Sequence, residues 1–391
     1  MVTIEIPAIG TPVRSVALHL NFLLSTSAPI SAATIKGPTL TFTRASNAMV
    51  WNESGVLVQK SSNESRFDHD PAASNAALGL LIEMARTNNQ LWSDDWTNAV
   101  YTATNITAAK DATGPDGAAN SASTLTADAN NGDIIQTITL GSAEYTTSVL
   151  MKRKTGTGTV EITDNDFTNA TDITADINSS TWTQVGNITR TQANPVVGIR
   201  LGTSGDEVEV ALGQCEAGAF MTSPIPTTTA TVTRAQDVCT TTDMSWMTST
   251  RTFTFIAEWE VRAGDTGLDA YMFSVLRDGN TSAVNLYDRN NHVFASWINN
   301  PTANDAIING TTNLGTTAHK GAVASADDDA ALYLDGSSEG TNSTVDEEDW
   351  TLVSLEIGRR VTNAAILNGH IQDLKYWPIR KTNAELATET T

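Results

Sequence analysis

Paired carboxylates are the feature of this sequence that most suggests chemistry. Glu258 and Glu260 stand on either side of Trp259, in a stretch that alternates apolar and polar residues from Phe253 to Val261. A period of two is typical of a β-strand, so both carboxylates should lie on one face and Trp259 on the other. Two carboxylates that converge across a cleft are the groups that glycoside hydrolysis requires.

The predicted strand lacks a third acid, however. Jelly-roll glucanases place Glu, Asp and Glu at alternating positions of one strand, and the next alternating position here is Arg262. The sequence also contains no Walker loop, no H-E-x-x-H motif and no paired C-x-x-C. We therefore expect no catalytic residue, and the sequence predicts a protein that is not an enzyme.

Residue types that bind metals also occur, but not in a metal-binding pattern. In Asp68-His69-Asp70 the two aspartates would face one side of a strand and the histidine the other, and Asp70-Pro71 favours a turn. The acidic run from Glu161 to Asp176 lacks the glycine and the closing glutamate of a calcium-binding loop. We expect no metal site and no cofactor, although this run leaves room for an adventitious Ca²⁺ ion.

Sugar binding needs an aromatic face with polar groups around it. The aromatic candidates on predicted loops or strand edges are Trp297, Trp350, Trp96 and Tyr101, and the hydrogen-bonding candidates are Asn290, Asn291 and Asp288. For each tryptophan a place in the core is an open alternative, because large aromatic side chains mostly fill cores. Trp182, at the start of a predicted strand, has the same two interpretations.

Short β-strands joined by polar turns must position these residues. Hydrophobic residues make up 40% of the chain and charged residues 17%, which is the balance of a globular protein. Stretches with helical periodicity are nearly absent, and Pro224-Ile225-Pro226 interrupts the strand pattern because proline removes a backbone donor. We therefore predict an all-β protein with two jelly-roll β-sandwiches in tandem, behind an extended, partly β N-terminal region.

These breaks in the pattern also predict how the chain is divided. The predicted units are an attachment region at 1–105, a first sandwich at 106–225, a linker at 226–250 and a second sandwich at 251–391 that ends in a short helix. Thr382 and Glu385 form a capping box for that helix. Residues 1–38 are too poor in apolar side chains to build a core of their own. They either dock on another protein or pack along the chain's own sandwich.

The charge balance argues against two classes of partner. Lysine and arginine number 23 against 44 aspartates and glutamates, which gives a formal net charge of −21. A nucleic-acid-binding protein needs a basic face to neutralise phosphates. An acidic surface is repelled by anionic lipids, and no apolar run approaches the ~18 residues that span a membrane. We expect neither nucleic-acid binding nor membrane insertion.

The two cysteines, Cys215 and Cys239, lie on either side of the proline-marked break. Two cysteines in so long a chain do not make a disulfide framework. Small buried thiols are the expected state, and a disulfide between them is the alternative.

Several motifs, in one order, resemble a block found in virion proteins of tailed bacteriophages. The motifs of the first half are TFTRAS (41–46), SGVLVQ (54–59), RFDHDP (66–71), GLLIEMARTN (79–88) and SDDWTNA (93–99). Those of the second half are EAGAFMTSPIPTTTATVTRAQDVC (216–239), YLDG (333–336), SLEIGRR (354–360) and LNGHIQDLKYWPIRKTNAEL (367–386). The resemblance covers most residues from about Thr39 onward and leaves out the first 38.

The resemblance implies a carbohydrate-binding-module-like jelly roll followed by a concanavalin A/laminin-G-like lectin domain. It further implies a structural protein on the exterior of the virion, made in the host cytoplasm, with residues 1–105 as the virion-attachment region. Head fibre, capsid decoration and tail fibre or spike are not separable from the sequence. The implied partners are other virion proteins, host-surface polysaccharide and further copies of the chain in a homo-oligomer such as a trimer. Two rival functions stay open: a secreted protein that binds or hydrolyses polysaccharide, and a ligand-free capsid cement protein.

Overall fold

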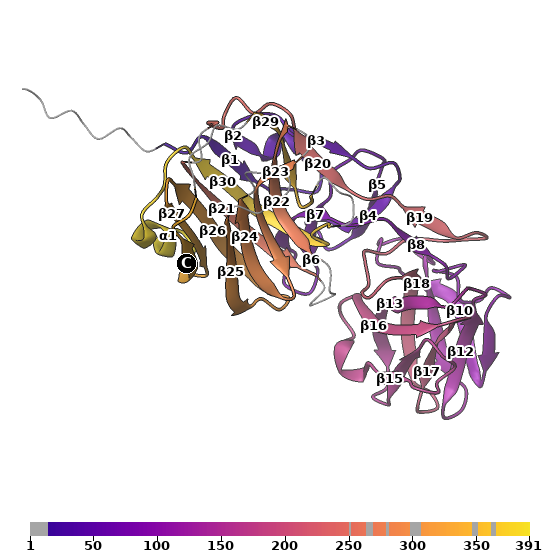
Figure 1. Cartoon of the computed structure of the whole chain (residues 1–391). Helices are drawn as coiled ribbons and strands as arrows, with labels where there is room; N and C mark the ends of the chain where they lie inside the picture. Colours follow the sequence, from indigo (N-terminus) through magenta and orange to yellow (C-terminus); the bar gives the residue numbers. More distant parts are fainter. Residues whose placement is uncertain are drawn as a thin grey trace, which may run out of the picture.

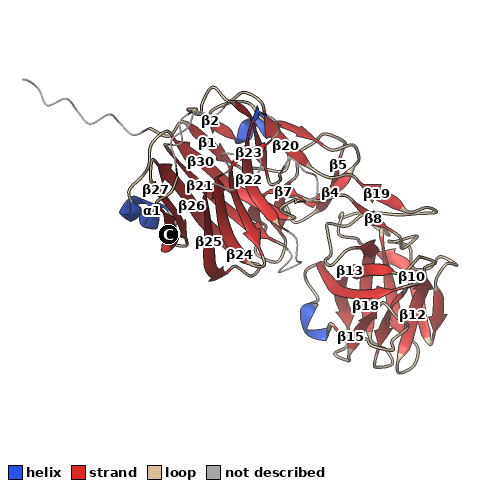
Figure 2. Ribbon diagram, in the orientation of Figure 1, coloured by secondary structure: helices blue, strands red, loops and turns tan. Residues whose placement is uncertain are grey.

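The computed structural model describes residues 15–249, 252–262, 269–278, 281–297, 306–345, 351–360 and 365–391. Within these ranges strands dominate, and helical structure is confined to two short 3-10 helices and one α-helix (Figure 2). The predicted all-β class is therefore confirmed. The strands form two sandwich lobes, a large one and a small one, which lie side by side (Figure 1).

The small lobe consists of two facing sheets. The β13 sheet contains β10 (Ile106–Ala112), β11 (Ala122–Ala127), β18 (Glu207–Ala217), β13 (Ala143–Thr155) and β16 (Thr183–Gln192), and is extended by β8 (Arg86–Asn88) and β19 (Val232–Arg234). The β17 sheet contains β15 (Thr171–Asp172), β14 (Val160–Thr163), β17 (Val196–Leu201), β12 (Gly132–Thr137) and β9 (Thr102–Thr104), with the 3-10 helix η2 (Thr174–Asp176) beside it. Alternate residues of both sheets, such as Val208 and Ile199, fill the space between them.

The large lobe also pairs two sheets. The β21 sheet contains β2 (Thr34–Lys36), β1 (Leu18–Asn21), β30 (Gly369–Trp377), β21 (Phe253–Val261), β26 (Ala318–Ala326), β27 (Asp329–Leu334) and β28 (Ser337–Asn342), with β7 (Ala76–Ile82) and β6 (Phe67–Asp70) attached beside β30. The β22 sheet contains β25 (Ala306–Asn313), β24 (His292–Trp297), β23 (Thr281–Arg289), β22 (Ala270–Arg277), β29 (Leu352–Ile357), β20 (Val238–Thr241) and β3 (Thr41–Thr43). The 3-10 helix η1 (Ile30–Ala33) precedes β2.

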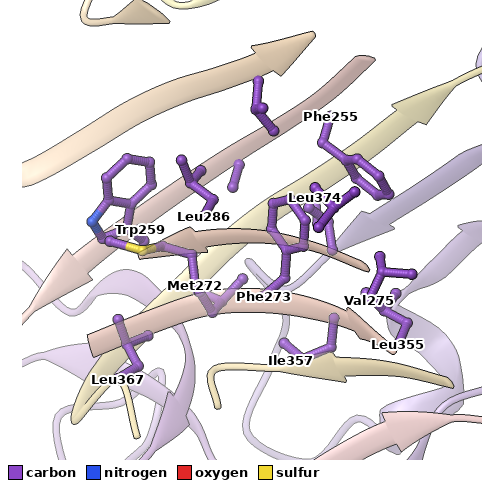
Figure 3. Close-up of a cluster of buried hydrophobic side chains, with 14 of the residues drawn as sticks. Phe255, Trp259, Met272, Phe273, Val275, Leu286, Leu355, Ile357, Leu367 and Leu374 are labelled. Atoms are coloured by element: carbon purple, nitrogen blue, oxygen red, sulfur yellow. The ribbon is translucent and has the colours of Figure 1, made fainter. Parts of the chain in front are cut away.

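Period-two alternation explains the core between these sheets. Phe255 and Trp259 of β21 point into this core, where the Phe255 ring lies 4.6 Å from that of Phe273 of β22. Figure 3 shows Trp259 beside Leu286 and Met272 in the same cluster. The opposite face of β21 behaves differently: Ile256 packs under the α-helix α1 (Asn383–Glu389). The predicted capping box begins this helix, since the Thr382 and Glu385 side chains each accept a backbone hydrogen bond from the other residue.

The N-terminal strands are part of the large lobe. β1 pairs with β30, with Leu18 opposite Tyr376, and β6 and β7 continue the same sheet. Packing along the chain's own sandwich is therefore the arrangement that the structure shows for these residues. Residues 226–250, predicted as a linker, contain β19 and β20, and β20 pairs with β3 and β29. Residues 1–14 lie outside the described ranges.

A hairpin connects the two lobes. β4 (Ala48–Trp51) and β5 (Leu57–Lys60) pair with each other, and Met49 and Leu57 pack on Leu150 and Leu212 of the β13 sheet. The segment just before the hairpin lies in the β22 sheet and the segment just after it in the β21 sheet. The hairpin thus covers the outer face of the small lobe while both its ends are anchored in the large one.

Five charged side chains, the junction network, are buried where the lobes meet. They are Arg44, Arg66, Glu83, Arg234 and Asp237, and none is more than 1% exposed. The contacts are Arg44 Nη1 to Asp237 Oδ1 at 3.1 Å, Arg66 Nη1 to Glu83 Oε2 at 2.7 Å, Arg234 Nη1 to Glu83 Oε2 at 3.1 Å, and Arg66 to Asp237. Ser223 adds two more hydrogen bonds to Glu83, from its backbone N at 2.7 Å and from its Oγ at 2.6 Å.

The guanidinium groups keep the central carboxylate ionised. Burial alone would raise the pKa of Glu83, but Arg234, Arg66 and the nearby Arg262 outweigh it and hold that pKa well below its usual value. By contrast, burial raises the pKa of the Cys215 thiol to about 12. Both cysteines are buried and unpaired in the structure, as expected.

Removing one member of the junction network should be far costlier than removing a surface charge. Arg66→Met leaves Glu83 and Asp237 buried without their shared partner, so the free energy of unfolding should fall by about 3–5 kcal/mol. Urea unfolding followed by tryptophan fluorescence measures this. Lys154→Met is the control, because Lys154 lies 3.8 Å from Glu207 at the surface and such pairs contribute at most ~1 kcal/mol. Equal effects of the two substitutions would contradict the role given to the network.

Candidate functional site

Trp96 and Tyr101 do not form a sugar platform, because the structure buries both. Trp96 is 2% exposed and Tyr101 8%, and their rings stack at 4.8 Å within the core of the small lobe. Trp96 Nε1 donates to the carbonyl of Ser93 at 3.1 Å, and the Tyr101 hydroxyl donates to backbone carbonyls. The alternative interpretation, that these aromatic residues fill a core, is correct for this pair.

The polar candidates of the second sandwich lie at one hairpin. Asn290 and Asn291 form the turn between β23 and β24 with φ of 52° and 64°, the left-handed conformation that a two-residue hairpin turn requires. Asn291 Oδ1 accepts the backbone N–H of Gly315 at 2.8 Å, so this side chain holds a neighbouring loop. Asp288 is only 7% exposed. These residues serve the hairpin itself.

The backbone of Trp297, a further aromatic candidate, lies away from that turn. Trp297 ends β24 opposite Val284, five residues along the strand from His292. At ~3.3 Å per residue its backbone lies about 16 Å from His292, the residue that follows the turn at Asn290 and Asn291. The side chain of Trp297 and the whole of Trp350 lie outside the described parts of the chain.

A different set of residues lines a cleft between the two lobes. It encloses about 200 Å³. Its lining comes from the turn after β6, from the start of β16 in the small lobe, and from β21 and β30 in the large lobe. The residues that give it chemical character are Trp51, Trp182, Asp68, Asp70, Glu260, Arg262 and His370. The cleft exists only in the folded chain, because its walls come from segments up to ~300 residues apart in sequence.

Two tryptophans form the aromatic part of the cleft. Trp51 ends β4, Trp182 precedes β16, and both are half-buried, with part of each ring packed on the apolar cluster under the hairpin. Lys152 Nζ lies 5.2 Å from the ring centre of Trp182, and Glu209 holds that lysine at 2.8 Å. The Lys152 ammonium and the apolar cluster together hold the Trp182 ring in place, and part of the ring stays accessible.

A buried hydrogen bond between Asp68 and His370 forms the polar floor. Asp68 Oδ2 accepts from Nε2 of His370 at 3.0 Å, and Asp68 Oδ1 accepts the backbone N–H groups of Trp51 and His69 at 3.0 and 3.1 Å. Burial alone would raise the pKa of Asp68, but His370 and Arg262 outweigh it and the pKa is lowered. His69 and Asp70 line the same cleft, and Nδ1 of His69 lies 3.3 Å from the carbonyl of Trp51.

Glu260 and Arg262 complete the floor from β21. Register places Glu260 opposite His370 on β30, and Glu260 Oε2 lies 4.0 Å from His370 Nδ1. Gly369 permits this close strand approach, because a Cβ there would lie 2.1 Å from the carbonyl oxygen of Glu260. Arg262 Nη1 lies 3.5 Å from Glu83 Oε1, so the floor of the cleft touches the junction network.

The predicted pair of strand carboxylates is divided between two hollows. Glu258 and Glu260 share a face of β21, as the alternation predicted, but Glu258 lines a separate hollow with His319, Lys320 and Asp335. The two glutamates therefore do not face each other across one cleft. Within the described ranges no group of three or more His, Cys, Asp or Glu side chains is arranged to hold a metal ion, and no helix is long and apolar enough to cross a membrane.

Trp182 and Glu260 were candidate site residues in the sequence, whereas Trp51, Arg262 and His370 were not predicted to belong to a site with them. A local signal existed for Trp51 and Asp68, which lie in or beside the motifs of the first half. No local pattern indicates that His370 comes to lie against Asp68, because that contact joins residues 302 positions apart.

Comparisons with known proteins give partial likenesses only. No protein-family model matches the chain, and no curated protein matches it. Among solved structures, the carbohydrate-binding module CBM40 of a Ruminococcus gnavus sialidase, bound to α2,3-sialyllactose, is 14% identical, with a TM-score of 0.31 over 36% of this chain and 83% of that one. A heptameric pentraxin of Limulus polyphemus is 15% identical, with a TM-score of 0.31 over 36% and 70%. The receptor-binding domain of botulinum neurotoxin type G is 10% identical, with a TM-score of 0.31 over 39% of each chain. Likenesses of this extent say nothing about what this chain binds.

Asp68 should make the stability of the protein sensitive to acid. Because the pKa of Asp68 is lowered in the folded state, its stabilising effect is present above the unfolded-state pKa near ~3.9 and is lost as pH falls through the folded-state value. Asp68→Asn should lower the free energy of unfolding by about 2 kcal/mol at neutral pH and flatten its fall below about pH 4. Urea unfolding at a series of pH values measures both effects. Asp111→Asn, at an exposed carboxylate, should change neither.

Proposed function

We propose that this chain is a structural protein of the exterior of a tailed-bacteriophage particle, and that its interlobe cleft binds glycans of the host surface. The observation that carries the binding proposal is the composition of the cleft. Two half-buried tryptophan rings, Trp51 and Trp182, stand over a floor of fixed polar groups. Aromatic faces with a few oriented polar groups are what sugar rings require.

The size of the cleft supports recognition of a single sugar ring. A volume of about 200 Å³ is below the ~300–1,000 Å³ of typical pockets for drug-sized ligands. One ring of a longer polysaccharide would fill it, with the rest of the chain outside. Binding of this kind is weak at each site, so a homo-oligomer such as a trimer would gain affinity through multivalency.

The particle location is supported by the motif resemblance. Four of its motifs supply the charged side chains of the junction network. They are Arg44 in TFTRAS, Arg66 in RFDHDP, Glu83 in GLLIEMARTN, and Arg234 with Asp237 in the motif at 216–239. The motifs that carry the resemblance therefore contain the residues that form the buried ion pairs between the lobes. We propose synthesis in the host cytoplasm, assembly onto other virion proteins, and a binding role without catalysis.

A glycan array probed with the full-length chain tests the binding proposal. Trp182→Ala and Trp51→Ala should each weaken the strongest signal by about tenfold, because each removes one aromatic stacking surface. Trp246→Ala is the matched control: Trp246 is also half-buried but packs against Phe255 and Tyr376, away from the cleft. An array without any signal would leave the ligand-free cement function instead, and equal losses in all three variants would contradict the cleft as the binding site.

Immunogold labelling tests the location. Antibody raised against the full-length chain should decorate the surface of purified, intact phage particles, at the head or at the tail. Antibody that labels particles only after they are disrupted, or that finds the chain only in the medium, would favour the secreted polysaccharide-binding alternative.

A further inference from the structure

The floor of the cleft contains a buried nitrogen atom without a partner. His370 is 1% exposed, and since the ionised Asp68 can only accept, Nε2 of His370 must carry the proton between them. Its other nitrogen, Nδ1, has no hydrogen-bond partner among the described residues. A buried polar atom without a partner is unfavourable, so a polar group of a ligand would be stabilised at Nδ1.

The spacing of His370 and Glu260 suits two hydrogen-bond donors. Nδ1 and Oε2 are 4.0 Å apart, too far for a hydrogen bond with each other. An imidazole that carries its proton on Nε2 accepts at Nδ1, and the carboxylate of Glu260 is an acceptor as well. A single hydroxyl has one proton and cannot donate to both, but two neighbouring hydroxyl groups of one sugar ring can donate one hydrogen bond to each.

The charges around this point disfavour anions. Asp68, Asp70 and Glu260 line the cleft, and the positive charge of Arg262 is directed to Glu83. A carboxylated sugar would therefore place its anion beside like charges, which is costly in a partly desolvated site.

We infer that Glu260 and His370 accept hydrogen bonds from the hydroxyl groups of an uncharged sugar ring, and that the cleft rejects sugars that carry a carboxylate. This inference rests on the proposed function and specifies its ligand class. Trp51 and Trp182 supply the stacking surface, and the two polar side chains supply the selectivity.

The test compares matched glycan pairs on the full-length protein. The probes are mannan and mannuronate oligosaccharides, galactan and galacturonate oligosaccharides, and lactose and sialyllactose, each measured by glycan array and then by titration calorimetry. In any pair that binds, the neutral sugar should bind at least about tenfold more tightly than the carboxylated one. Glu260→Gln should weaken the neutral probe and reduce the difference between the members by about tenfold, because it removes the nearest negative charge.

Glu258→Gln is the matched control, since it makes the same change on the same strand face but in the other hollow. It should leave both affinities unchanged, and circular dichroism should show that both variants fold. Tighter binding of the carboxylated members, or a Glu260→Gln variant that behaves like Glu258→Gln, would overturn the inference while the Trp182-dependent binding stood. Absence of binding to every probe would instead remove the proposed function and this inference together.

Discussion

Buried arginines at the junction of the lobes are the constraint on which the rest of the structure depends. Taking a charge out of water costs several kcal/mol unless a partner is fixed beside it. Arg44, Arg66 and Arg234 meet this condition through Glu83 and Asp237, which are themselves fully buried. The segments that carry these side chains therefore cannot separate one at a time. The arrangement is maintained mainly because any other arrangement would leave a buried charge without a partner, and less because any single ion pair is strong.

The same carboxylate positions both walls of the cleft. Glu83 receives the backbone N–H of Ser223, and the carbonyl of the preceding Thr222 accepts from Gln184, two residues beyond Trp182. On the other wall Glu83 lies against Arg262, two residues beyond Glu260. The aromatic wall and the polar floor are thus linked through one buried group. A site between two lobes can be rigid when a network of this kind fixes the lobes relative to each other.

Local sequence patterns predicted individual strands and the final helix, but they did not predict which strands pair across long stretches of the chain. The alternation of Phe253 to Val261 predicted which residues of that strand face the core between the sheets, although Thr254 and Ile256 on the other face are buried too. The capping box predicted the final helix. The sequence did not indicate that the strand at Leu18 pairs beside Tyr376, because a short strand carries no information about its partner. The prediction that Trp96 and Tyr101 bind sugar was wrong for a related reason. Trp96 stands in a polar, turn-rich segment that looks exposed, and only the packed lobe reveals that its ring stacks on Tyr101 in the interior.

The order of strands in the large lobe has a consequence for how the protein is made. The small lobe is inserted between β7 and β20, and β1 finds its neighbour β30 about 360 residues later. At ribosomal speeds of ~5–20 residues per second the first strand is exposed for roughly 20–70 s before its partner emerges. During that time the unpaired edge is a template for wrong partners, including nascent chains on the same message. The inserted lobe faces no such delay, since its strands are all present once Arg234 has left the exit tunnel. It can therefore be complete on the ribosome while the lobe that surrounds it in sequence still waits for its last strands.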